Sequence, residues 1–226
     1  MRRSGIATPP VTALPGSARF RRMRIGLLGG SFNPAHTGHR HISVEALNRL
    51  GLDEVWWLVS PQNPMKSGRD MASLERRLRH ARRVAAHPRI RVMDLEKALG
   101  TRYSVDTLGA LSSLMPATRL VWLMGADNLL TLHLWRRWEA VFRAVPVAIF
   151  DRAPYSIKAA FAKAAQRYRR FRLGEDQASG LADRHPPAWV FVHCPRHPLS
   201  ATAIRTADAG WLDQEQDADR RRATAR

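Results

Sequence analysis

Short apolar runs alternate with helical patterns along most of the chain from Met23 onward. The runs have the length of β-strands and are apolar almost throughout, which is typical of parallel strands covered by helices on both faces. The sequence therefore predicts a single doubly wound α/β domain. The predicted strands cover residues 24–30, 54–60, 89–93, 119–125, 146–150 and 188–193, and the predicted helices cover about 38–50, 73–87, 105–115, 135–145, 155–169 and 200–210.

The segment 73–87 has a clear amphipathic helical pattern. We expect Ser73 to be its N-cap, an apolar stripe to face the core, and its arginines to face solvent. The stripe consists of Leu74, Leu78, Ala81 and Ala85. Residues 174–187 are instead rich in glycine, proline and charge, and we expect a surface loop there.

The 226 residues carry a formal net charge of +18, which attracts polyanions such as nucleic acid or phosphate-bearing small molecules. Residues 1–22 hold several arginines and no acidic residue. We assign them to a basic, disordered leader, and leave open a nucleic-acid-binding arm or a start of translation at Met23. Residues 23–212 form the predicted folded domain, and 213–226 a charged tail.

No run approaches the roughly 20 apolar residues that a membrane span needs, and the leader lacks the apolar core of a signal peptide. Cys194 is the only cysteine, which excludes an intramolecular disulfide and a zinc site built on several cysteines. We expect a cytoplasmic protein without membrane contact, in which Cys194 is a buried or half-buried residue at a strand end. The sequence leaves a homo-oligomer open.

Residues 26–43, GLLGGSFNPAHTGHRHIS, connect the first predicted strand to the first predicted helix, a place where open α/β sheets bind ligands. Gly29 and Gly30 would let backbone N–H groups approach a ligand, and the helix start would attract an anion. Because His36 and His39 are three residues apart, both imidazoles can face the same side. A zinc site needs a third ligand that no nearby residue supplies. Two readings stay open, namely histidines that satisfy backbone groups and histidines that donate hydrogen bonds to a polyphosphate.

A second anion site is predicted near the end of the chain. In PLSATAIR, residues 198–205, Ser200 and Thr202 lie at the start of the last predicted helix, and Arg205 follows one turn later. Hydroxyl groups at a helix start and an arginine on the same face suit a phosphate.

At this point the chain resembles a known family. GGSFNPAHTGH resembles the G-G-[ST]-F-[DN]-P-x-H-x-G-H signature of the bacterial nicotinate-nucleotide adenylyltransferases, which belong to the nucleotidyltransferase superfamily. LSATAIR is similar to their I-S-[ST]-T-x-[IL]-R block, and SPQNPMK, TRYSVDTL and GADNLLTLHLWRRW match their other blocks in order. The resemblance covers residues 23–212 and implies a single Rossmann-like nucleotidyltransferase domain that acts in NAD biosynthesis.

The resemblance implies that the adenylyl group of ATP is transferred to nicotinate mononucleotide without a covalent intermediate, giving deamido-NAD and pyrophosphate. It implies that His36, His39 and Arg205 are the catalytic residues. Mg²⁺ would be bound mainly through the ATP phosphates, with no metal ligand among the side chains. The implied ATP-binding residues are Gly29, Gly30, Ser31, Phe32, His36, His39, Gly125, Asp127, Ser200, Thr202 and Arg205.

For the acceptor, Trp135 offers a ring on which a pyridine can stack, although a core position for Trp135 stays open. The hydroxyl of Ser104 and the N–H of Val105 would receive the nicotinate carboxylate, so a nicotinamide would be discriminated against. The implied residues for nicotinate mononucleotide are Asn33, Lys66, Tyr103, Ser104, Val105, Trp135 and Arg136.

Asn33 replaces the frequent aspartate of the signature, and Ala201 stands where a hydroxyl is common. Two alternatives remain at this stage. One is another adenylyl- or cytidylyltransferase of the same fold, acting on nicotinamide mononucleotide or phosphopantetheine. The other is a basic nucleic-acid-binding α/β protein, although we do not expect nucleic acid as the partner.

Overall fold

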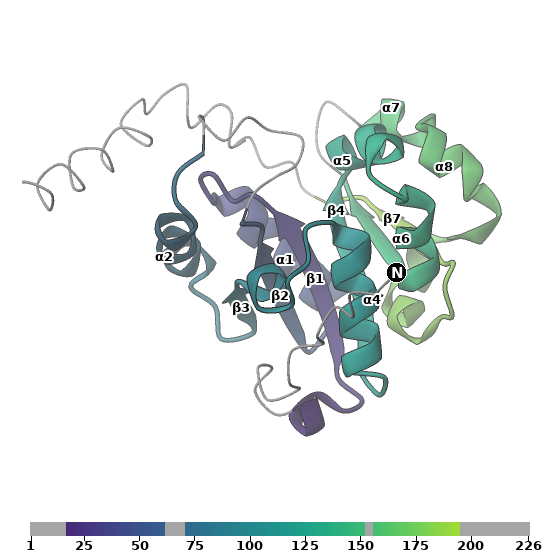
Figure 1. Cartoon of the computed structure of the whole chain (residues 1–226). Coiled ribbons are helices and arrows are strands. Elements are labelled where there is room, and N and C mark those ends of the chain that lie inside the picture. Colours follow the sequence, from purple (N-terminus) through teal and green to yellow (C-terminus); the bar gives the residue numbers. More distant parts are fainter. Residues whose placement is uncertain (1–16, 62–70, 152–155, 195–226) are drawn as a thin grey trace, which may run out of the picture.

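The computed structural model describes residues 17–61, 71–151 and 156–194, and a seven-stranded sheet forms its centre (Figure 1). The strand order is β3-β2-β1-β4-β5-β7-β6, and every neighbouring pair is parallel. The strands are β1 (Arg24–Gly30), β2 (Glu54–Val59), β3 (Ile90–Met93), β4 (Arg119–Gly125), β5 (Val147–Phe150), β6 (Arg172–Leu173) and β7 (Trp189–Val192). The predicted doubly wound fold is confirmed, and the strand order reverses between β1 and β4.

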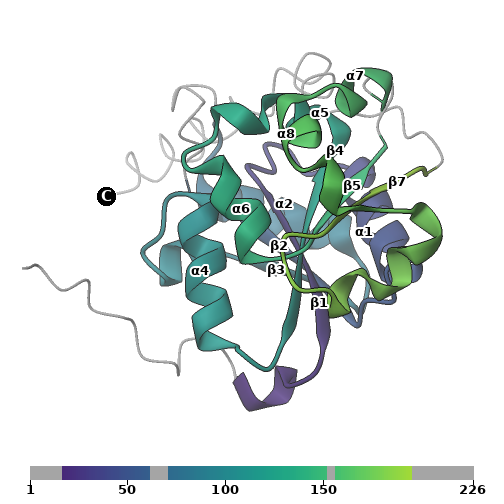
Figure 2. The same cartoon turned by 90° about the vertical axis from the view of Figure 1, so that its right-hand side faces the viewer.

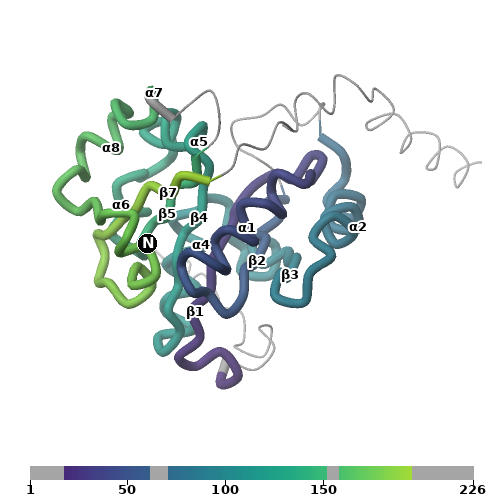
Figure 3. The backbone as a smooth tube through the Cα atoms, turned by 180° about the vertical axis from the view of Figure 1, so that it is seen from behind, coloured from purple at the N-terminus to yellow at the C-terminus, as the bar shows by residue number. Residues whose placement is uncertain are grey.

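Helices cover both faces of the sheet, with α4 and α6 on one face and α1 on the other (Figure 2). Seen from behind, α1 crosses in front of the strands and α2 lies beside it (Figure 3). The α-helices are α1 (Thr37–Arg49), α2 (Leu74–Ala85), α3 (Leu95–Ala98), α4 (Ser104–Leu114), α5 (Ala126–Thr131), α6 (Trp138–Ala144), α7 (Ser156–Ala160) and α8 (Lys163–Arg167), and 3-10 helices cover Ser17–Phe20, Leu132–Leu134, Arg169–Phe171 and Glu175–Asp183. Within the described ranges, no helix is long and apolar enough to cross a membrane.

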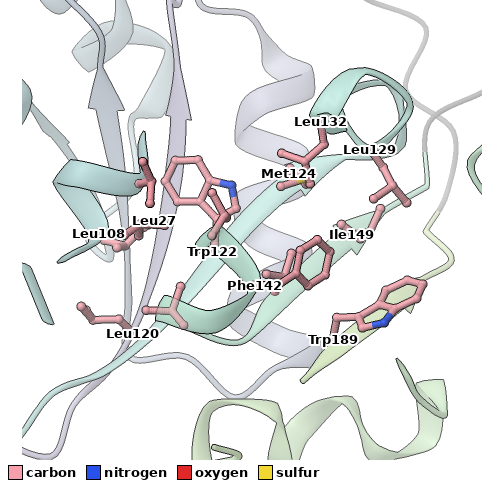
Figure 4. Packing of buried hydrophobic residues seen from close by; sticks show 14 of the residues in the cluster. Leu27, Leu108, Leu120, Trp122, Met124, Leu129, Leu132, Phe142, Ile149 and Trp189 are labelled. Carbon is pink, nitrogen blue, oxygen red and sulfur yellow. The ribbon is translucent and has the colours of Figure 1, made fainter. Parts of the chain in front are cut away.

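The core consists of two apolar clusters, one on each face of the sheet. Because side chains alternate along a strand, Trp56 and Trp122 belong to the cluster under α4 and α6, whereas Trp57 belongs to the cluster under α1 and α2. Figure 4 shows the first cluster, in which Trp122 lies beside Leu27 and Leu108. Each fully buried large side chain contributes about 1.5–3 kcal/mol of hydrophobic stabilisation, so the sheet is a rigid base for its loops.

The folded part of the chain begins before Met23, which corrects the predicted leader of residues 1–22. Residues Ser17–Phe20 form a 3-10 helix, and Phe20 is only 2% exposed. Its ring packs edge-on against Trp56 with 5.0 Å between ring centroids, and the Thr118 hydroxyl donates to the Phe20 carbonyl. Phe20 therefore belongs to the packed core of the domain. Residues 1–16 and the tail 213–226 lie outside the described residues.

Three further segments differ from the sequence prediction. Residues 174–187 are not a surface loop, because Glu175–Asp183 form a 3-10 helix that buries Ala178, Leu181 and Ala182 on the sheet. The predicted helix 155–169 is divided into α7 and α8, since Ala162 has an extended backbone. The predicted helix 135–145 begins only at Trp138, and α5 and the 3-10 helix Leu132–Leu134 precede it.

Candidate active site

The loops after β1 and β4 meet at the point where the strand order reverses. Leu28 of β1 lies opposite Leu123 of β4, so Gly30 at the end of β1 lies level with Gly125. Gly125 is the N-cap of α5, and Asp127 lies in the first turn of that helix. The sheet therefore brings together the two loops to which ATP binding was assigned, at the position where doubly wound folds bind nucleotides.

Gly29 is required by packing, and its assignment to ATP binding stays a prediction. A Cβ atom on Gly29 would lie 2.3 Å from Cη2 of Trp122, far closer than two carbon atoms pack. A Cβ atom on Gly30 would make only ordinary contacts with the Phe32 ring, the nearest at 3.5 Å. The carbonyl of Gly30 accepts a hydrogen bond from the N–H of Ser60, which joins the loops after β1 and β2.

His36 and His39 cap the start of α1 reciprocally. Nδ1 of His36 accepts a hydrogen bond from the N–H of Gly38 at 3.1 Å, and Nδ1 of His39 accepts from the N–H of His36 at 3.2 Å. The two bonds form a capping box, and the ring centroids are 3.9 Å apart. Four N–H groups at a helix start lack partners within the helix. The histidines thus satisfy two backbone donors at the start of α1.

These bonds also determine where each imidazole carries its proton. A ring nitrogen that accepts a hydrogen bond has no proton, so the neutral ring carries its N–H at Nε2. Both Nε2 atoms are therefore donors, which suits an anion and not a metal ion. The reading in which the histidines satisfy backbone groups is confirmed, and the donor at Nε2 leaves the polyphosphate reading compatible with the structure.

A buried layer beneath the histidines sets their orientation. The Phe32 ring, 2% exposed, contacts the His39 ring at 4.7 Å and stacks on Trp57 at 5.0 Å between centroids. Trp57 donates from Nε1 to the Ser43 hydroxyl, which donates to the His39 carbonyl at 2.8 Å. The side chain of Phe32, to which ATP binding was assigned, supports His39 from below.

Asn33 is also a supporting residue, and its assignment to the acceptor stays a prediction. It is 2% exposed, and its Oδ1 accepts a hydrogen bond from the N–H of Ala72 at 3.2 Å. The carbonyl of the half-buried Ser31 accepts from the guanidinium of Arg77 at 2.7 Å. The loop after β1 is therefore tied to the segment that precedes α2.

The residues assigned to the nicotinate lie at two adjoining helix starts. Tyr103 is the N-cap of α4, and the guanidinium of Arg136 lies 4.9 Å from the centre of its ring, in cation–π distance. Arg137 forms an ion pair with Asp106 in the first turn of α4. Trp135 is half-buried and packs against the core cluster under α6, so it is in part a core residue, and its stacking on a pyridine stays a prediction.

The start of α4 also offers backbone donors. Asp106 and Thr107 are the first residues of α4 whose N–H groups bond to the carbonyl of Tyr103. Ser104 and Val105 precede them, and N–H groups at these positions of a helix attract a carboxylate. Of the predicted acceptor residues, Tyr103 and Arg136 are thus in contact, and Ser104 and Val105 follow Tyr103 at the start of α4.

Comparisons with known proteins agree with this arrangement. The family model described as cytidylyltransferase-like matches residues 27–207. A probable nicotinate-nucleotide adenylyltransferase of Methylorubrum extorquens is 51% identical over 184 residues, which cover 81% of this chain and 100% of the relative. Another, from a Bradyrhizobium species, is 49% identical over 84% of this chain and 98% of its own. The chain belongs to the nicotinate-nucleotide adenylyltransferase family.

The solved structure of Plasmodium falciparum nicotinic acid mononucleotide adenylyltransferase complexed with NaAD has the same fold. Its TM-score is 0.63 at 17% sequence identity, over 81% of this chain and 83% of that one. This adenylyltransferase family member thus shares its doubly wound fold with that solved structure. The resemblance found in the sequence motifs is confirmed.

Several assignments fall beyond the described part of this adenylyltransferase chain. Lys66, Ser200, Thr202 and Arg205 lie outside the described residues, as does the predicted helix 200–210. Cys194 follows β7 and is half-buried, as expected, and burial raises the pKa of its thiol to about 11. Such a thiol is a poor nucleophile at neutral pH.

Two residues of this family member were missed by the sequence analysis. The arginines of α2 were expected to face solvent, but Arg77 is 1% exposed and donates to four backbone carbonyls. Glu96 of α3, 5% exposed, was not considered. The signal for Arg77 was present, because it lies three residues after Leu74 and four before Ala81 and so shares their face.

Proposed function

We propose that this protein transfers the adenylyl group of ATP to the phosphate of nicotinate mononucleotide. A phosphate oxygen of the mononucleotide attacks the α-phosphorus of ATP, the bond between that phosphorus and the bridging oxygen to the β-phosphate breaks, and pyrophosphate leaves. The products are deamido-NAD and pyrophosphate. The observation that carries the proposal is the pair of imidazoles at the start of α1, each with its N–H at Nε2.

The chemistry requires stabilisation of negative charge. Charge accumulates on the phosphate oxygens as the bond to pyrophosphate breaks, and fixed donors around these oxygens lower the barrier. His36 and His39 would supply two such donors, and the positive end of the 13-residue helix α1 would add to them. No side chain needs to form a covalent bond, so positioning and charge account for catalysis.

Mg²⁺ is the cofactor that we propose, carried mainly by the ATP phosphates. It prefers oxygen ligands and keeps several waters, which the phosphates of ATP allow. The histidines do not fit as its ligands, because Nδ1 of each accepts from the backbone and Nε2 carries the proton. In the described ranges, no group of three or more His, Cys, Asp or Glu side chains could hold a metal ion.

Specificity for the acid would arise at α4. The Ser104 hydroxyl and the N–H of Val105 would receive the carboxylate, and Arg136, which lies beside the Tyr103 ring, would add positive charge. An amide carries no charge to match them, so we expect kcat/KM for nicotinamide mononucleotide to be lower by roughly 100-fold or more. The cytoplasmic location expected from the sequence remains a prediction.

The test is a steady-state assay of pyrophosphate release with ATP and each mononucleotide, on wild type, His39→Gln and His39→Ala. A glutamine at this position can still bond to the N–H of the N-cap residue, so His39→Gln should keep its melting temperature and lose roughly 100-fold in kcat. His39→Ala should lose both. His185→Ala, at an exposed site before β7, is the control and should behave as wild type. If His39→Gln kept kcat within a few-fold, the phosphate role of the histidines would be wrong.

A further inference from the structure

Arg77 of α2 is buried where three loop segments meet. Its side chain donates from Nη1 to the carbonyls of Ser31 and Ser60, both at 2.7 Å, from Nη2 to the carbonyl of Pro61 at 2.9 Å, and from Nε to that of Ala72 at 2.8 Å. A buried charge is costly unless polar groups surround it, and these carbonyls surround the guanidinium. One planar side chain therefore fixes the loop after β1, which leads to the histidines, relative to the loop after β2.

Phe32, which directly follows Ser31, has a strained backbone. Its φ is 45°, a left-handed conformation that bulky L-residues rarely adopt. Such a conformation costs free energy and persists only where the surrounding contacts impose it. One of these contacts is the ring, which is 2% exposed and stacks on Trp57. Another is the bond from Arg77 to the Ser31 carbonyl, because it holds the peptide plane that precedes Phe32.

The left-handed conformation places the Phe32 ring beside the imidazole of His39. The ring centroids are 4.7 Å apart, and the Trp57 ring lies 5.9 Å from the same imidazole. A rotation of the peptide between Ser31 and Phe32 would move the ring on which His39 rests. It would therefore also move Nε2 of His39, the donor that we propose for the ATP phosphates.

The segment around α2 holds the rest of this loop as well. The N–H of Ala72 donates to Oδ1 of Asn33 at 3.2 Å, and Nε2 of His80 lies 3.0 Å from the carbonyl oxygen of Ala35. Together with the bond from Arg77, these contacts fix residues 31, 33 and 35 of the loop that ends at the histidines. The contact from Arg77 is the one that lies next to the strained residue.

We propose that Arg77 is a positioning residue for adenylyl transfer, which acts through Phe32 on His39. The inference rests on the proposed function. The guanidinium holds the Ser31 carbonyl, the held peptide keeps Phe32 left-handed, and the Phe32 ring keeps the imidazole directed at the phosphates. A displacement of reacting groups by about 1 Å can lower a rate by roughly 100-fold. Because Arg77 needs no contact with a substrate for this role, kcat should respond more than either KM.

A second arginine offers a matched control. Nε and Nη2 of Arg91 on β3 donate to the two carboxylate oxygens of Glu54, both at 2.6 Å. Glu54 is the first residue of β2, whereas Ser60 follows the last. The two arginines therefore make forked contacts at opposite ends of the same strand, and only the contact of Arg77 lies at the end where the histidine loop begins.

The test compares wild type, Arg77→Lys and Arg91→Lys in steady-state assays and in thermal melts. Lysine keeps the charge but cannot make the planar fork of bonds, so both variants should melt at a lower temperature than wild type. Arg77→Lys should lose roughly 10-fold or more in kcat, with each KM within about 3-fold of wild type, and Arg91→Lys should keep its kcat. A wild-type kcat in Arg77→Lys, or an equal loss of kcat in both variants, would overturn the proposal.

Phe32→Leu tests the path from Arg77 to His39, because leucine keeps an apolar side chain but not the ring. It should lower kcat roughly 10-fold, and adding Arg77→Lys should lower kcat little further, since both changes act on the same contact. Losses that multiply in the double variant would show that Arg77 does not act through Phe32, and the proposal would be wrong.

Phe32→Leu also decides the question if Arg77→Lys does not fold, because a wild-type kcat in Phe32→Leu would remove the step through the ring and overturn the proposal. Failure of the proposed function gives a different result. If wild type itself formed no deamido-NAD, the proposed function would fail; if wild type turned over and Arg77→Lys matched it, only the positioning role would fail.

Discussion

Replacing Gly29 by alanine should destabilise the sheet through one contact. The new methyl group would lie 2.3 Å from Cη2 and 3.0 Å from Cζ2 of Trp122, and the closer of these contacts is more than 1 Å short of the roughly 3.5 Å at which carbon atoms pack. Trp122 is 1% exposed, and Leu27 and Leu108 lie beside its ring (Figure 4), so the indole has little room to move. Overpacking of this kind costs about 1–3 kcal/mol, and we expect about 3 kcal/mol because the indole is rigid.

A double-mutant cycle measures this contact. We would determine the free energy of unfolding by urea titration for Gly29→Ala, Trp122→Phe and the double variant. A phenyl ring is smaller than the indole and does not reach the added methyl group, so the double variant should recover about 2 kcal/mol relative to the sum of the single changes. Trp122→Phe alone should cost little, because it removes a buried N–H that has no partner among the described residues.

The result that would refute the packing argument is additivity. If the double variant were as unstable as the sum of both changes, the ring contact would not be the reason for a glycine at position 29. If stability returned while the KM for ATP stayed high, the backbone would need glycine for a ligand as well, as the sequence interpretation held. Steady-state assays on the refolded double variant separate these outcomes.

His36→Asn keeps an N-cap acceptor, so the free energy of unfolding, measured by urea titration, should fall by only about 1–2 kcal/mol. The variant loses the donor at Nε2, so kcat, measured in rate assays, should fall roughly 100-fold. Glu54→Gln should cost about 2 kcal/mol at pH 7. Burial opposes ionisation of Glu54, but hydrogen bonds from Arg91 and Trp56 lower its pKa below the ordinary 4.5. The stability that ionised Glu54 contributes is therefore present above pH 4.5 and is lost as the pH falls through the folded pKa. At that low pH, urea titration should find wild type and Glu54→Gln equally stable. For Glu96 the sign is opposite, because burial raises its folded pKa to about 7, above the ordinary 4.5. The wild-type protein therefore loses stability as the pH rises from 4.5 to 7 and the buried carboxyl ionises. Compared with wild type, Glu96→Gln should be about 2 kcal/mol more stable at pH 8 and equally stable near pH 4.

Strong patterns in the sequence were sufficient for the sheet. The apolar runs predicted six of the strands to within a residue or two at their ends, because a parallel strand buried on both faces has no other composition available. The 3-10 helix Glu175–Asp183 was missed although Ala178, Leu181 and Ala182 have helical spacing. Its glycine and charged residues dominated the composition, and short apolar residues gave a weak periodic signal.

The candidate site, too, was predicted only in part. The motif placed the histidines correctly at the start of a helix, but burial and hydrogen bonding within the loops could not be read from residue types. The need for glycine at position 29 comes from an indole on another strand. The Asn33 side chain accepts from a backbone N–H 39 residues away, and the Arg77 side chain donates to carbonyls from three loop segments. Each of these contacts joins separate elements of the fold, and local pattern carries no information on its geometry.

The capping box of His36 and His39 explains why imidazoles suit this position better than the usual caps. Serine, threonine and glutamate also satisfy the N–H groups of a helix start, but a carboxylate would repel a phosphate. An imidazole has two ring nitrogens, so one accepts from the backbone while the other is a donor with its proton held there by the first bond. Folding thereby sets the tautomer that the proposed phosphate role needs, at no further cost in free energy when ATP binds. A chain with serine at position 36 should lose only about 1–2 kcal/mol of unfolding free energy, as His36→Asn does, and yet lose most of the rate, which separates the capping role of the imidazole from its role as a donor.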